Sequence, residues 1–159
     1  MDVIRVQEAP FQFDAEVDAL RAGNPAIGAV VTFLGLMRDF NDGDRVLAMT
    51  LEHYPGMTEK SLGAIVAEAR ERWELQGVRV VHRVGELRPE DPIVLVAVAS
   101  PHRGEAFRAC EFIIDYLKTR APFWKKERTE SGERWVEARH SDDAAEARWR
   151  DEDLSGEGC

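Results

Sequence analysis

The segment Ile93–Ala99 constrains the fold most, because all of its residues are apolar and most are β-branched. A short, uninterrupted apolar run is typical of a strand at the centre of a sheet, covered on both faces. The segment Arg103–Ala121 follows almost at once and predicts a long amphipathic helix. Its apolar stripe comprises Ala106, Phe107, Cys110, Ile113, Ile114 and Leu117.

The rest of the chain predicts an α+β fold, in which helices pack on a mixed or antiparallel sheet. Two further helices are expected, at 14–22 and Thr58–Trp73. The expected further strands are Val3–Val6, Ile27–Met37, Val46–His53, Val78–Val84, Phe123–Thr129 and Arg134–Glu137. The turn at Asp39–Asp44 predicts that the second and third of these strands form one long hairpin, and the last two form another.

The length and charge of the chain predict one domain with an acidic extension. A chain of 159 residues fits a single domain, which we place at 1–140. The segment 141–159 holds seven acids and two arginines, and so supplies −5 of the net charge of −9. An acidic, polar segment of this kind is expected to be solvated and partly disordered. Nucleic-acid binding is not expected, because it requires a broad basic face.

The sequence predicts a cytoplasmic protein that does not enter a membrane. No apolar run approaches the roughly 20 residues that a membrane span requires. The segment Met1–Arg5 lacks the basic and apolar regions of a signal peptide. Cys110 falls in the apolar stripe and is expected to be a buried thiol, and Cys159, at the end of the acidic segment, is expected to be mobile.

The sequence predicts neither a metal site nor a bound cofactor. Its four histidines are too scattered for zinc ligation, there is no Cys-x-x-Cys, and the phosphate-binding glycine motifs are absent. His82 alternates with Val80 and Val84 along a predicted strand. This position favours a hydrogen-bonded core histidine.

A compact cationic cluster stands out in this acidic chain. The segment Lys118–Arg128 contains five basic residues and one acid. Lys118 lies at the margin of the apolar stripe at 100° per residue, where it is partly desolvated. A lysine pKa near 10.4 must fall by roughly 3 units for proton transfer near neutrality, and desolvation and neighbouring cations both lower it. The alternative is a solvated lysine that interacts with the helix dipole.

Two loops are candidates for anion binding. Gly35–Gly43 places Arg38 at a strand end, where its guanidinium can present a rigid fork to a phosphate or carboxylate. The alternative for Arg38 is a surface ion pair with the neighbouring aspartates. Ser100–Glu105 places His102 and Arg103 at a helix N-terminus, which favours anions. The alternative is a simple helix cap with a solvated arginine.

Four sequence motifs carry a resemblance to a known family. They are Leu51–Thr58, Val84–Leu87, His102-Arg103 and, above all, Asp115–Lys125. Together they resemble the large, catalytic subunit of molybdopterin synthase, and the likeness extends over about Val3 to Trp149. The resemblance implies an α/β hammerhead-type domain with additional antiparallel strands.

The resemblance also implies a sulfurtransferase of molybdenum cofactor biosynthesis. In that family a small ubiquitin-like subunit carries a C-terminal Gly-Gly thiocarboxylate. Its sulfur is transferred to cyclic pyranopterin monophosphate, which forms the dithiolene of molybdopterin. Two large subunits form the central dimer of a heterotetramer. The competing interpretation is a non-catalytic binding module for a phosphorylated pterin, which would require no sulfur incorporation.

The resemblance assigns roles to particular residues. Lys118 and Lys125 match the family's essential lysines. Arg38, His102 and Arg103 match residues that hold the phosphate and the pterin, with one group donated across the dimer. The expected pocket residues beside these are Leu36, Met37, Lys126 and Glu127. Lys126 stands where relatives often have arginine, which preserves the charge and loses a bidentate fork.

Overall fold

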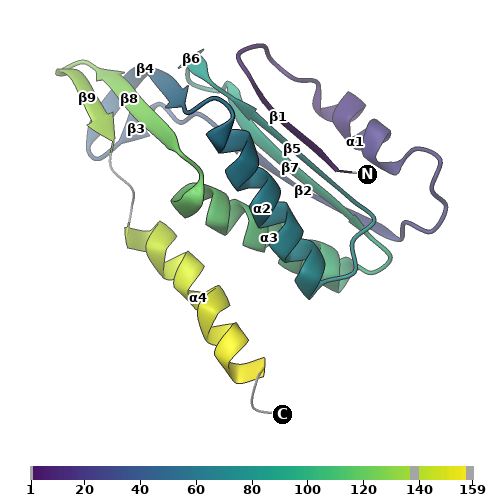
Figure 1. Ribbon diagram of the computed structural model, residues 1–159. Helices are drawn as coiled ribbons and strands as arrows, with labels where there is room; N and C mark the ends of the chain where they lie inside the picture. The colour runs from purple at the N-terminus through teal and green to yellow at the C-terminus, as the bar shows by residue number, and fades with distance from the viewer. Residues whose placement is uncertain (1, 137–139, 157–159) are drawn as a thin grey trace.

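The computed structural model describes residues 2–136 and 140–156 and confirms the α+β class (Figure 1). Its first sheet contains β1 (Val3–Gln7), β5 (Gly77–Arg83), β7 (Pro92–Ser100) and β2 (Ala29–Leu36), in that spatial order. β1 and β5 are parallel, and the other neighbours are antiparallel. The sheet is therefore mixed, with β2 at one edge.

Helices cover both faces of this sheet, as the apolar run Ile93–Ala99 predicted. α2 (Met57–Arg72) and α3 (Arg103–Arg120) lie on one face, and α1 (Phe13–Arg21) lies on the other (Figure 1). The main core beneath α2 and α3 includes Val94, Val96 and Val98 of β7. Leu95 and Ala97 belong to a separate cluster with Phe11. Alternate side chains of β7 thus enter opposite cores.

The buried face of α3 includes four of the six residues of the predicted stripe; Ile114 is partly buried, and Phe107 lies outside the buried face. Phe107 is 61% exposed, and Cys110 is buried as expected. The buried residues of α3 are Ala106, Ala109, Cys110, Phe112, Ile113, Tyr116 and Leu117. Phe107 lies about 200° around the helix from Ala109, so it points away from the sheet. None of the helices within the described ranges is long and apolar enough to cross a membrane.

The second sheet forms a curled antiparallel layer at one end of the molecule. Its strands are β3 (Phe40–Asn41), β4 (Asp44–His53), β8 (Phe123–Thr129) and β9 (Gly132–Val136). β6 (Gly85–Leu87) pairs with β4 on the edge opposite β8. The predicted hairpin of β8 and β9 is confirmed over these residues.

The predicted long hairpin between Ile27–Met37 and Val46–His53 is wrong. β2 pairs with β7, and β4 pairs with β8 and with the short strand β3. Asp42 and Gly43 form the turn between β3 and β4 with φ values of 51° and 82°, so the turn itself was predicted correctly. Turn chemistry is local, whereas the partner of β2 lies some 60 residues further along the chain.

The acidic C-terminal segment contains a helix within the described residues. α4 (His140–Gly156) lies beside α3 (Figure 1). Trp149 is buried against Trp73 and Phe112, with ring centroids 5.6 and 5.4 Å away, and its indole N–H donates to Asp115 Oδ2 at 2.8 Å. One aromatic anchor therefore docks a helix that was expected to be solvated. Cys159 lies outside the described residues.

Candidate functional site

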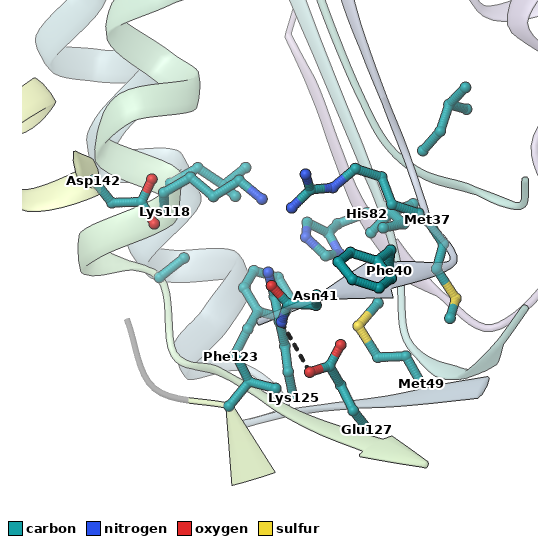
Figure 2. Close-up of a pocket in the computed structure, with 16 residues that line it drawn as sticks. Met37, Phe40, Asn41, Met49, His82, Lys118, Phe123, Lys125, Glu127 and Asp142 are labelled. Atoms are coloured by element: carbon teal, nitrogen blue, oxygen red, sulfur yellow. Dashed lines mark hydrogen bonds between the residues drawn. The ribbon is translucent and has the colours of Figure 1, made fainter. Parts of the chain in front are cut away.

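A cavity of about 350 Å³ lies where the end of α3, strand β8 and the loop after β2 meet (Figure 2). The site residues predicted from the sequence that line it are Leu36, Met37, Arg38, Lys118, Lys125 and Glu127. The wall also contains Phe40, Asn41, Met49, His82, Ile93, Leu117, Ala121, Phe123, Val136 and Asp142. The tertiary fold thus brings two lysines and an arginine from separate segments to one space.

The junction between α3 and β8 fixes the two lysines relative to each other. α3 ends at Arg120, and β8 begins only three residues later. Pro122 presents its carbonyl to Thr58 Oγ1, which donates at 3.2 Å, and the Phe123 N–H donates to the Ala121 carbonyl at 2.9 Å. Thr58 is completely buried, so this bond anchors the junction to α2. Lys118 and Lys125 consequently enter the cavity from its two sides (Figure 2).

The loop after β2 is held by backbone hydrogen bonds at Met37. The Met37 N–H donates to the Asp91 carbonyl, and the Glu90 N–H donates to the Met37 carbonyl, both at 2.9 Å. Met37 is buried, and the next residue, Arg38, is exposed while it lines the cavity. This arrangement places a guanidinium at the rim, where an anion would enter. Asp44, one of the acids considered as its partner, pairs with Arg134 at 3.1 Å.

Glu127 is a buried acid in the cationic cavity. It is 5% exposed, accepts a hydrogen bond from Asn41 Nδ2 at 2.9 Å, and lies 3.4 Å from Arg134 Nε. These contacts join β3 and β9 to β8 through one carboxylate. Because a buried charge is costly without partners, Glu127 has a structural role at the cavity wall as well as a place in its lining.

Lys126 is not among the residues that line this cavity. Its ammonium lies 3.0 Å from Glu133 and 5.7 Å from the centroid of the Trp135 ring. Successive residues of a strand point to opposite faces, so Lys126 faces away from Lys125 and Glu127. It borders a second, smaller hollow of about 110 Å³.

His102 and Arg103 lie at the opposite end of α3 from Lys118. Both are exposed. The 15-residue separation corresponds to about 22 Å along the helix axis, so Arg103 cannot enter the cavity of its own chain. The His102 side chain makes no capping hydrogen bond. Instead, the His102 N–H donates to Ser100 Oγ at 3.3 Å, a bond within the loop before the helix that does not cap it.

His82 is a cavity residue that the sequence interpretation did not assign to the site. As predicted, it is a hydrogen-bonded core histidine, 4% exposed, with Nδ1 at 2.7 Å from the Arg83 carbonyl oxygen. Burial, followed by the nearby charges of Lys118 and Lys125, lowers the pKa of His82 to about 3. The alternation of His82 with Val80 could have indicated this position, because it placed the ring on the sheet face that α3 covers.

The fold and the site define an α+β protein in which clustered cations line one cavity. No group of three potential metal ligands (His, Cys, Asp or Glu) occurs within the described ranges. The sequence profile of the MoaE protein family matches residues 6–120. The molybdopterin synthase catalytic subunit of Ralstonia nicotianae is 66% identical over 149 residues, which cover 94% of this chain and 85% of that protein.

Solved structures share the fold. The molybdopterin biosynthesis MoaE protein from Burkholderia ambifaria is 59% identical, with a TM-score of 0.81 over 94% of this chain and 98% of the other. A complex of subunits 1 and 2 of molybdopterin-converting factor from Helicobacter pylori contains a chain with the same fold at 15% identity. Its TM-score is 0.67, over 86% of this chain and 91% of that one.

The chain belongs to the MoaE family, the catalytic subunits of molybdopterin synthase, and acts as an enzyme in molybdopterin biosynthesis. The resemblance seen in the sequence motifs is thereby confirmed. A binding module without catalytic activity, the competing interpretation, is not needed to explain the cationic cavity.

Proposed function

We propose that this cavity is where sulfur passes from the C-terminal thiocarboxylate of a small subunit to cyclic pyranopterin monophosphate. The observation that supports it is the convergence of Lys118, Lys125 and Arg38 on one space of about 350 Å³. A cavity of this size suits a small ligand. Both reactants are anions, and the cations offset the cost of bringing them together in an acidic protein.

Lys118 is the central catalytic residue in this proposal. Its ammonium pairs with the thiocarboxylate, or its amine attacks the acyl carbon and displaces the sulfur, and water then hydrolyses the amide that forms. In each transfer the acyl C–S bond breaks, a C–S bond replaces a C–O bond on the pterin side chain, and the acyl group ends as a carboxylate with oxygen from water. The displaced oxygen leaves with the phosphate in one transfer, which opens the cyclic ester, and as water in the other. Lys125 orients the substrate or moves a proton.

A second copy of the chain completes the site. His102 and Arg103 lie too far from Lys118 within one chain, so they reach a cavity only from a neighbouring copy. The proposed assembly is a central dimer with a small subunit at each end, located in the cytoplasm. The Helicobacter pylori complex, in which a chain of this fold associates with a second subunit, supports the small partner. Lys126 contributes charge near the site rather than a direct contact.

The test is a single-turnover reaction of the Lys118→Ala chain with a thiocarboxylated small subunit. Mass spectrometry of the pterin product counts the sulfur atoms incorporated. The expected result is a rate lower by at least about 100-fold, in line with the loss of a general acid–base or nucleophilic group. Thermal unfolding serves as the folding control. Near-normal dithiolene formation by a folded variant would overturn the assignment.

A further inference from the structure

His82 stands at the wall of the cavity with one ring edge still available for a ligand. Its ring stacks on Phe123, with centroids 3.9 Å apart and an angle of 18° between the planes. Its Nδ1 edge is occupied by the Arg83 carbonyl. Figure 2 shows the ring pointing into the cavity, on the side that faces Lys118. Within 2–136 and 140–156, no hydrogen bond engages Nε2.

The bond at Nδ1 determines the chemical character of Nε2. A carbonyl oxygen only accepts hydrogen bonds, so the proton between Nδ1 and the Arg83 carbonyl must belong to the imidazole. Because burial and the nearby lysines keep the ring neutral, the second nitrogen carries a lone pair. His82 therefore presents an uncharged hydrogen-bond acceptor to the cavity.

The cavity lining also holds the carboxylates of Glu127 and Asp142 and the amide oxygen of Asn41. Asp142 lies beside Lys118, on the other side of the cavity from His82 (Figure 2). Lys118, Lys125 and Arg38 are donors that suit phosphate and thiocarboxylate oxygens. The carboxylate of Glu127 already serves Asn41 and Arg134. A pterin ring, however, carries amide, amine and reduced-ring N–H groups, and these lose free energy in a closed cavity without an acceptor.

We propose that His82 is a substrate-positioning residue whose Nε2 accepts a hydrogen bond from a ring N–H of the pterin. This inference rests on the proposed function, because it assumes a pterin in the cavity. Stacking on Phe123 and the bond to Arg83 fix the ring, so the acceptor is oriented before the ligand arrives. The cations then hold the phosphate while His82 sets the orientation of the bicyclic ring.

Two substitutions separate this role from a purely structural one. His82→Gln places an amide oxygen near the position of Nε2 but loses the donor at Nδ1. His82→Asn keeps an N–H near Nδ1 for the Arg83 carbonyl and has no atom at Nε2. If the hydrogen bond from the pterin to Nε2 matters, Gln is the better substitute. If the histidine only satisfies the Arg83 carbonyl, Asn is the better one.

The measurement is equilibrium binding of cyclic pyranopterin monophosphate to each chain without the small subunit, followed by KM and kcat with it. The expected result is Kd and KM within about 3-fold of the unsubstituted chain for His82→Gln. An increase of about 10-fold or more is expected for His82→Asn, as for one lost buried hydrogen bond, with a smaller change in kcat. Equal or tighter binding by His82→Asn overturns the inference. Failure of the unsubstituted chain to bind this pterin would instead overturn the proposed function.

Discussion

Lys125 and Lys126 are adjacent in the chain and lie on opposite faces of β8. Lys125 lines the cavity that Lys118 enters, whereas Lys126 pairs with Glu133 at 3.0 Å on the other face. The register with β4 places Lys125 opposite Leu51, a buried residue, and Lys126 opposite Thr50. Two residues of equal charge therefore have unequal access to a ligand in the cavity.

Replacement of Lys125 by alanine should lower activity much more than replacement of Lys126. We expect a loss of at least about 100-fold in kcat/KM for Lys125→Ala, because it removes a cation that, in the proposed function, contacts the reactants. Lys126→Ala should cost less than about 10-fold, since an exposed ion pair contributes at most about 1 kcal/mol. Lys126→Ala is the matched control for Lys125→Ala, because both variants remove one positive charge from the same strand. Similar losses for the two would contradict the assignment of Lys125 to the cavity.

Mixing two inactive variants should restore activity if a second copy completes the site. Lys118→Ala and Arg103→Glu disable different parts of the proposed composite site. In a random mixture, about half of the dimers would contain one chain of each kind. Each of these mixed dimers would have one intact site and one inactive site, so activity should return to about a quarter of normal. The measurement is sulfur incorporation before and after the two chains are unfolded together and refolded. If both residues acted within one chain, the mixture would stay inactive.

His82 should make the protein less stable as the pH falls below neutrality. Its pKa is about 3 in the folded state against about 6.5 when unfolded, so between these values the unfolded chain binds the extra proton. The histidine should therefore cost about 2 kcal/mol of folding free energy between pH 7 and pH 5. Urea unfolding of the chain and of His82→Gln at both pH values measures the difference. Parallel pH profiles would show that His82 protonates freely in the folded state.

Loss of Trp149 should release α4 from α3. Trp149→Ala removes the aromatic contacts with Phe112 and Trp73, and we expect a cost of about 3 kcal/mol for the docked helix. Limited proteolysis should then cut the C-terminal segment before the rest of the domain. Burial raises the pKa of Asp115 and the hydrogen bond from Trp149 partly offsets that rise, so the substitution also removes a contact that stabilises the Asp115 carboxylate.

A suitable control for this prediction is Trp135→Ala. Trp135 is 56% exposed on β9, so its loss should change the stability by less than about 1 kcal/mol. Slow proteolysis of the Trp149→Ala chain, no faster than that of Trp135→Ala, would contradict an anchoring role. The comparison separates loss of an indole ring from loss of the helix contact.

Local sequence patterns were sufficient to predict elements that depend on residues close together in the chain. The apolar run Ile93–Ala99 predicted a strand covered on both faces, and the Asp42-Gly43 turn was correctly placed. The same logic failed for the partner of β2. Strand pairing depends on contacts between distant segments, and a correct turn between β3 and β4 gives no information about where β2 lies.

The sequence alone determined the α+β class, the family and a cationic cluster at the end of a long helix, because composition, periodicity and motif spacing are properties of the chain. Only the tertiary structure decided which side chains share the cavity. Packing sends Lys125 to one face of β8 and Lys126 to the other, and it places His82 beside Lys118 from segments 36 residues apart. The direction of a side chain depends on which faces are buried, and burial is fixed only when distant segments come together.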